Sequence, residues 1–166
     1  MGKIFILVVL LIGSMAGHAR NLPEVKLKTT DGKVVNTAEL SNDGKPMIIS
    51  FFALWCKPCL RELSAIAEVY EEWQKETGVK LVAVSIDDAR TTGKVQAEMN
   101  ARGFKWEVLL DPNSAFKQAM NVGSIPHVFV LNGKGEIVWQ HVSYTEGSED
   151  EIIEVLKKLN RGDKIK

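Results

Sequence analysis

The feature that most constrains the fold is a change of hydrophobic period between residues 45 and 78. The segment KPMIISFFAL is a short continuous apolar run, which is typical of a strand buried on both faces. Beyond Pro58, apolar residues recur every three or four positions until Gly78, at Leu60, Leu63, Ile66, Ala67, Tyr70 and Trp73. The sequence therefore predicts a buried strand that runs directly into an amphipathic helix of about five turns.

The rest of the chain alternates strand and helix patterns. A hairpin over residues 25–40, turning at Asp31-Gly32, precedes this unit. The predicted elements after it are a buried strand (79–86), a weaker helix (92–103), a strand (105–110), a short helix (112–120), a hairpin (127–141) and a last helix from 148. For the short helix we expect Asp111 as the cap and Pro112 at the first helical position. This order predicts a mixed α/β sheet covered by helices on both faces.

The first nineteen residues differ in character from the others. They contain one cation, Lys3, an apolar run from Ile4 to Ile12, and small residues that end at Ala19. This layout predicts a signal peptide cut after Ala19, and hence export to the periplasm. The alternative is an uncleaved membrane anchor formed by residues 4–16, although a membrane span needs about 20 apolar residues. We expect one domain over residues 20–160 and a loose tail over 161–166.

The charge balance excludes one class of partner. Lysine plus arginine and aspartate plus glutamate are equal at 21 each, so no basic field is available to bind nucleic acid or an anionic membrane surface. We therefore expect no nucleic-acid partner, and membrane contact only through the N-terminal segment. We also expect no cofactor and a monomer.

The only two cysteines, Cys56 and Cys59, lie at the predicted junction between strand and helix. A disulfide closing so short a loop would constrain the unfolded chain little, so a purely structural role is a poor explanation. The helix N-terminus and the neighbouring cation Lys57 stabilise a thiolate at Cys56, whereas Cys59 lies one turn further in and is expected to be more buried. Thiol–disulfide exchange needs this difference between an attacking and a resolving thiol.

Two alternatives remain open at this point. Two cysteines with His127 are ligands suited to copper or zinc, and a glycine turn centred near Lys134 would place His127 opposite His141. The absence of a second CxxC from the sequence argues against such a metal carrier. The motif also leaves the direction of electron flow open, so a thiol oxidase of secreted proteins is the other alternative.

The sequences LWCKPCLRE and, far downstream, VGSIPHVFVLNGKGEIV resemble the thioredoxin superfamily, specifically its exported TlpA/ResA-like branch. The resemblance covers nearly all of the chain after residue 19. It implies a thioredoxin-like fold with the hairpin of 25–40 as an N-terminal addition and residues 88–110 as a central helix–strand insertion. It also implies that Pro126 is a cis-proline facing the cysteines and that the backbone of Ile125 binds a substrate strand.

The same resemblance assigns a role to Glu62. From position alone, Glu62 would be a solvated acid near a helix N-terminus. The branch pattern WCxPCxxE places an active-site acid there, within reach of Cys59. Thioredoxins proper keep a buried acid at the position of Ser50, and the branch often has proline where this chain has Ser64.

The implied activity is thiol–disulfide exchange with proteins, in the direction of reduction. The expected catalytic residues are Cys56, Cys59 and Glu62. The expected substrate-binding residues are Trp55, Lys57, Pro58, Ile125 and Pro126. The implied partners are protein disulfides, among them the haem-binding cysteines of apocytochrome c, and a membrane thiol protein that donates electrons.

Overall fold

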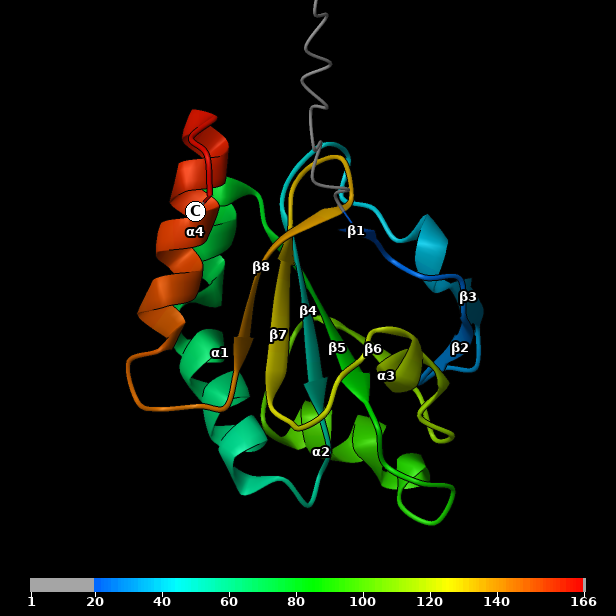
Figure 1. Ribbon diagram of the computed structural model, residues 1–166. Helices are drawn as coiled ribbons and strands as arrows, with labels where there is room; N and C mark the ends of the chain where they lie inside the picture. The colour runs from blue at the N-terminus through cyan, green and yellow to red at the C-terminus, as the bar shows by residue number, and fades with distance from the viewer. Residues whose placement is uncertain (1–19, 166) are drawn as a thin grey trace, which may run out of the picture.

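The computed structural model describes residues 20–165, in which an eight-stranded mixed sheet is flanked by helices (Figure 1). The strands are β1 (Arg20–Asn21), β2 (Lys26–Thr29), β3 (Val34–Asn36), β4 (Met47–Phe52), β5 (Lys80–Ser85), β6 (Glu107–Leu110), β7 (His127–Leu131) and β8 (Glu136–Val142). Their order across the sheet is β1-β8-β7-β4-β5-β6-β2-β3. The pairs β4–β5 and β5–β6 are parallel, and the other pairs are antiparallel. Every residue of β4 is buried, as its continuous apolar run predicts.

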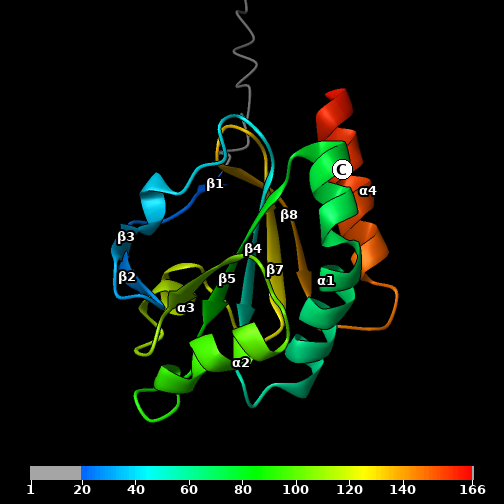
Figure 2. The same cartoon turned by 180° about the vertical axis from the view of Figure 1, so that it is seen from behind.

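Helices cover both faces of this sheet, and each face has its own apolar cluster. The helices are α1 (Lys57–Thr77), α2 (Val95–Ala101), α3 (Ala115–Ala119) and α4 (Glu149–Arg161), with short 3-10 turns η1 (Thr37–Glu39) and η2 (Thr92–Lys94). Side chains of α1, α2 and α4 share one cluster, whereas Phe116 of α3 belongs to the other. Figures 1 and 2 show α1 and α4 side by side, with α3 on the opposite side of the sheet. The helix α1 ends at Gly78, which adopts the left-handed conformation (φ 68°) that ends many helices.

The predicted N-terminal hairpin and central insertion are both present, and they pair with each other. The hairpin β2–β3 turns at Gly32, where φ is 89°. Its strand β2 pairs with the insertion strand β6 through Lys28 and Leu110, and Thr29 and Leu109. Together they extend the sheet on the side away from β7 and β8.

The short helix α3 begins three residues later than predicted. Pro112 lies in a turn closed by a hydrogen bond from the Ser114 N–H to the Asp111 carbonyl, and Ser114 adopts a left-handed conformation. The helix therefore starts at Ala115. The Asp111 carboxylate still accepts hydrogen bonds from its first turn, from the N–H groups of Phe116 (3.3 Å) and Lys117 (2.9 Å).

The predicted signal peptide or anchor, residues 1–19, lies outside the described residues. Within residues 20–165, no helix has the length and apolarity needed to cross a membrane. At the other end, Arg161 belongs to α4 rather than to the predicted tail, and Ile165 packs against the core cluster of α1 and α4.

Candidate active site

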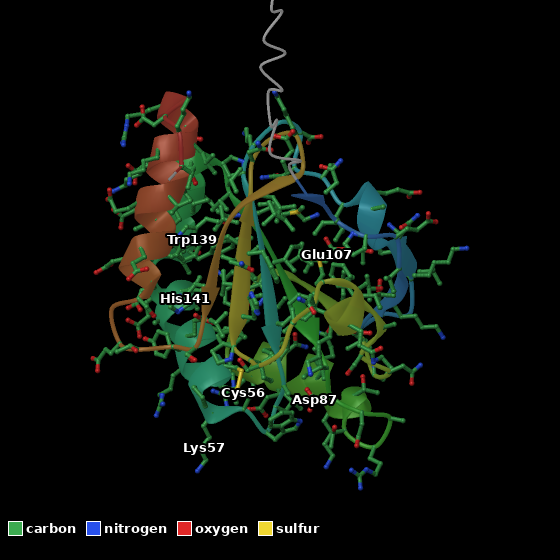
Figure 3. All side chains as sticks on the ribbon, in the orientation of Figure 1. Cys56, Lys57, Asp87, Glu107, Trp139 and His141 are labelled. Carbon is green, nitrogen blue, oxygen red and sulfur yellow. A yellow bond between two sulfur atoms is a disulfide. The ribbon has the colours of Figure 1, made fainter. Side chains whose placement is uncertain are left out.

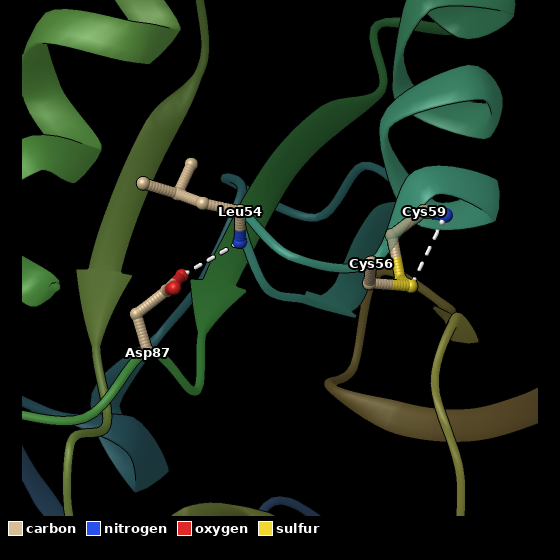
Figure 4. Close-up of a disulfide and its surroundings, with 4 residues drawn as sticks. All are labelled: Leu54, Cys56, Cys59 and Asp87. Atoms are coloured by element: carbon tan, nitrogen blue, oxygen red, sulfur yellow. Dashed lines mark hydrogen bonds between the residues drawn. A yellow bond between two sulfur atoms is a disulfide. The ribbon is translucent and has the colours of Figure 1, made fainter.

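The two cysteines lie at the junction between β4 and α1, as the change of hydrophobic period predicts. After Phe52 the chain turns, and the Cys56 N–H donates to the Ala53 carbonyl (3.0 Å). Cys56 is the N-cap of α1, and its Sγ accepts a hydrogen bond from the Cys59 N–H (3.3 Å). A disulfide joins Cys56 to Cys59 (Figure 4). The structure therefore shows the oxidised form of the pair, held at a helix N-terminus.

Exposure around the pair is uneven. Trp55 is 66% exposed and Lys57 is also exposed, whereas Pro58 is half-buried. Cys56 is 5% exposed and Cys59 1%. The difference between the cysteines has the predicted direction but is small, because in the oxidised form both are buried.

The loop before β7 lies at the same end of the sheet. The peptide bond between Ile125 and Pro126 is cis, as the resemblance implies. His127, which begins β7, pairs with Phe51 near the end of β4, so Pro126 lies beside the segment that leads to Cys56. The Ser143 N–H, just after β8, donates to the Pro126 carbonyl (3.0 Å) and ties this loop to the end of the hairpin.

Glu62 is buried on the inner side of α1 rather than solvated. Its exposure is 1%, and neither carboxylate oxygen has a hydrogen-bond partner within residues 20–165. Burial, and secondly the negative charge of Glu149, raise the pKa of Glu62 to about 8. Ser50 is buried in β4, at the position where thioredoxins proper carry an acid. Glu62 is therefore an unpaired buried carboxyl three residues after Cys59 on the same helix.

His141 of β8 approaches Glu62 from the sheet. The distance from His141 Nε2 to Glu62 Oε1 is 4.0 Å, and the histidine side chain is 18% exposed. The His141 ring stacks on Trp139, with centroids 5.8 Å apart and planes 5° apart. Both residues lie on the part of β8 next to α1 and α4 (Figure 3). No local sequence pattern indicates this neighbourhood, because it depends on the register of β8.

The prediction that His127 and His141 face each other is wrong. A β-bulge between Val130 and Leu131 shifts the hairpin by one residue, so that His127 pairs with Val142 and Val128 pairs with His141. Side chains alternate along a strand, so the two histidines lie on opposite faces of the sheet.

The proposed metal ligand His127 has protein contacts of its own. His127 Nε2 lies 3.2 Å from the Gln140 side-chain oxygen, and its ring stacks on Phe129. Burial lowers the pKa of His127. Among residues 20–165, no group of three or more His, Cys, Asp or Glu side chains is arranged to hold a metal ion.

Asp87, two residues after the end of β5, is a buried carboxylate. It accepts hydrogen bonds from the hydroxyl groups of Ser85 (2.9 Å) and Thr91 (3.2 Å), and it is fully buried. Both contacts join side chains, and η2 begins without a side-chain cap hydrogen bond. Asp87 also accepts a hydrogen bond from the backbone N–H of Leu54, in the loop before Cys56 (Figure 4).

Comparisons with known proteins agree with this geometry. Residues 19–140 match the AhpC/TSA family. The thiol-disulfide oxidoreductase ResA of Bacillus subtilis (strain 168) is 30% identical over 116 residues, which cover 70% of this chain and 62% of that protein. ResA of Bacillus thuringiensis (strain Al Hakam) is 28% identical over 140 residues, which cover 84% of this chain and 77% of that one.

A solved structure supports the same assignment. The solution structure of a thioredoxin-like protein from Porphyromonas gingivalis is 56% identical to this chain, with a TM-score of 0.77. The match covers 84% of this chain and 92% of that one. The predicted thioredoxin-like fold and the resemblance to the ResA branch are thereby confirmed.

Proposed function

Because the chain belongs to the AhpC/TSA family and is similar to thiol-disulfide oxidoreductases of the ResA type, we propose that it reduces disulfide bonds of exported proteins through Cys56 and Cys59. The observation that carries this proposal is the joined cysteine pair at the N-terminus of α1, beside the loop of Pro126. A helix N-terminus stabilises a thiolate, which is the attacking species in thiol–disulfide exchange.

The first step forms a mixed disulfide. In the reduced protein, the Cys56 thiolate attacks one sulfur of the substrate disulfide. A bond forms between Cys56 Sγ and that sulfur, the substrate S–S bond breaks, and the other substrate sulfur leaves as a thiolate that takes a proton from solvent. Cys56 suits this step because it precedes the first turn of α1 and is less buried than Cys59.

The second step releases the substrate. Cys59 gives its proton to the Glu62 carboxylate and attacks Cys56 Sγ, which forms the Cys56–Cys59 disulfide and expels the second substrate thiolate. Two electrons have then passed from the protein dithiol to the substrate. When a dithiol donor later attacks Cys56, Cys59 leaves as a thiolate and recovers the proton from Glu62. A pKa of about 8 suits both transfers, because it lies near the working pH of most proteins.

The surface around the pair would hold the substrate chain. Trp55 offers an exposed aromatic face beside the disulfide, and Lys57 and Pro58 border it on α1. Ile125 and Pro126 would bind an extended substrate segment through the backbone, in the manner of strand addition. A segment bound there would bring its disulfide to Cys56.

The cellular setting follows from the same proposal. Residues 1–19 would direct the chain to the periplasm or anchor it in the membrane, where it would act as a monomer. A membrane thiol protein would supply the electrons, and apocytochrome c would be among the substrates.

The reduction potential of the Cys56–Cys59 pair tests the direction of electron flow. The purified protein is equilibrated with dithiothreitol or glutathione buffers, and the fraction oxidised is read from the alkylated thiols. We expect a potential at or below about −270 mV, the value of thioredoxin, since a reductase must hold its electrons weakly. A potential closer to about −120 mV, the value of a strong oxidant, would assign the protein to the oxidation of secreted chains instead.

A further inference from the structure

Within residues 20–165, the imidazole of His141 lies 4.0 Å from the buried carboxyl of Glu62. Both Glu62 oxygens and the His141 Nε2 lack a hydrogen-bond partner within the described part of the chain. The Nε2 atom is itself buried and lies 4.0 Å from Glu62 Oε1, whereas the histidine side chain as a whole is 18% exposed. One side of the imidazole therefore faces the carboxyl and another part reaches the surface.

We propose that His141 is a positioning residue for Glu62, and that Glu62 exchanges its proton with solvent through the His141 imidazole. This inference rests on the proposed function, because it concerns the proton that Cys59 gives up during resolution. Imidazole suits the role, since one ring nitrogen can accept a proton while the other releases one. The Glu62 carboxyl is only 1% exposed, so it has no comparable contact with solvent through which to exchange its proton.

The fold holds His141 in the required place. Its pairing with Val128 puts its side chain on the sheet face that packs against α1, where Val128 shares a cluster with Cys59 and Leu63. The parallel Trp139 ring fixes the plane of the imidazole. A shift of about 1 Å would bring Nε2 and Oε1 into hydrogen-bond range, and catalytic contacts are often long in the absence of substrate.

The other titratable groups that act on Glu62 or His141 are Glu149, Tyr144 and His127. Glu149, the first residue of α4, adds negative charge that favours the protonated form of Glu62. Tyr144 lies in the loop between β8 and α4, and burial followed by the charge of Glu149 raises its pKa. His127 of β7 interacts with His141 from the opposite face of the sheet. None of these three makes a hydrogen bond with the Glu62 carboxyl among residues 20–165, whereas His141 Nε2 lies 4.0 Å from it.

The coupling between Glu62 and His141 can be measured without any activity. The side-chain carboxyl of Glu62 is followed by carbon NMR, with pH, in the oxidised full chain labelled at glutamate, and E62Q assigns its signal. We expect the Glu62 midpoint to move in H141Q, because this variant removes the imidazole whose Nε2 lies 4.0 Å from the Glu62 carboxyl. Reciprocally, E62Q should shift the titration of the His141 ring.

These variants have a matched control. E68Q replaces an exposed glutamate on the same helix and should leave the titration of the His141 ring unchanged. In E62Q the coupling is measured from the titration of the His141 ring, with residue 141 unchanged. The test therefore remains decisive even if H141Q folds poorly. Unchanged titration of Glu62 in H141Q, together with an unchanged His141 ring in E62Q, would overturn the inference.

The rate of release of the mixed disulfide tests whether Glu62 and His141 act together during the reaction. We expect H141Q to slow release of the mixed disulfide about tenfold near neutral pH, which is less than the roughly hundredfold or more that direct proton transfer contributes, because His141 acts through Glu62. Formation of the mixed disulfide should be unaffected, and H141Q/E62Q should be no slower than E62Q alone. Additive losses would show that His141 acts independently of Glu62 and would reject the inference while leaving the proposed function intact. A wild-type chain that reduces no disulfide would overturn the proposed function, and with it the role of His141.

Discussion

The carboxylate of Asp87 accepts a hydrogen bond of 2.9 Å from the backbone N–H of Leu54, 33 residues earlier in the chain (Figure 4). Leu54 lies two residues before Cys56, in the turn between β4 and α1. Asp87 lies two residues after β5, at the start of the segment that leads into the central insertion. The insertion is thus tied to the loop that carries the cysteine pair, and a buried charged acceptor forms the tie.

We expect Asp87→Ala to destabilise the protein strongly and locally. The change leaves the Leu54 N–H and the hydroxyl groups of Ser85 and Thr91 without their common acceptor. Buried donors that lose a charged partner cost about 2–4 kcal/mol in total. Urea unfolding of the oxidised protein measures the loss of stability. Hydrogen exchange should show the Leu54 amide losing its protection first.

Asp88→Asn is the matched control for this change. Asp88 pairs with Arg90 at the surface, where both side chains are largely solvated. Its replacement should leave the unfolding midpoint close to that of the wild type. If the two substitutions lowered the free energy of unfolding equally, the hydrogen bonds of Asp87 would not be what stabilises the loop before Cys56.

Glu62 should make the stability of the oxidised protein depend on pH. Its pKa is about 8 in the folded protein and 4.5 is the ordinary value, so the folded state binds the proton more tightly than the unfolded state does. The stabilisation is therefore complete below pH 4.5 and is lost as the pH rises towards and through about 8. Each unit of pKa difference corresponds to about 1.4 kcal/mol, so the loss amounts to several kcal/mol.

Glu62→Gln removes this dependence and keeps the shape of the side chain. Urea unfolding at pH 5 and pH 9 should show a smaller decrease for E62Q than for the wild type. At pH 9 the variant should be the more stable protein, because it carries no buried charge. Parallel stability curves for the two proteins would show that Glu62 is solvated in solution.

Cys59→Ser should trap the first intermediate. With the resolving thiol removed, the mixed disulfide through Cys56 cannot be released by internal attack. Incubation with a disulfide-containing protein such as insulin should give a covalent adduct that mass spectrometry assigns to Cys56 and that dithiothreitol reverses. Cys56→Ser should give none, because Cys59 is buried at 1% exposure. Equal adducts from both variants would reject the proposed order of attack.

The parts of this structure that were predictable from sequence are those set by local pattern. The change of period at Pro58 marks the junction of β4 and α1 because burial on both faces and helical amphipathicity leave different signatures in a few residues. Gly32 and Gly78 mark a turn and a helix end because each position requires a positive φ. The cis state of Pro126 came from resemblance alone, since trans is the commoner state even before proline.

The parts that were not predictable depend on contacts between distant segments. The bulge at Val130 and Leu131 moves His141 by one position relative to β7, and no local signal marks it. The burial of Glu62 depends on β8 and α4, which lie about 80 residues further along the chain, so its helix position suggested a solvated acid. Both features belong to the same site, because that site forms only when the C-terminal hairpin and helix pack against α1.

Trp55→Ala should impair the use of protein substrates without affecting stability. Trp55 is 66% exposed, so its loss creates no cavity, and the free energy of unfolding should change by no more than about 0.5 kcal/mol. An exposed tryptophan beside a reactive disulfide is a typical anchor for a protein partner, and its truncation commonly costs more than about 1 kcal/mol of binding. The KM for insulin reduction should therefore rise about fivefold to tenfold, since about 1.4 kcal/mol is tenfold.

A small substrate and a distant substitution separate binding from chemistry in this prediction. Oxidised glutathione reaches Cys56 without covering Trp55, so its rate of reduction should change much less in W55A. Val34, 57% exposed on the N-terminal hairpin, provides the control for removal of an exposed apolar side chain away from the site. V34A should match the wild type with both substrates. An equal loss for insulin and glutathione in W55A would mean that Trp55 acts on the cysteine pair itself, and the aromatic face would then have to be removed from the proposed substrate surface.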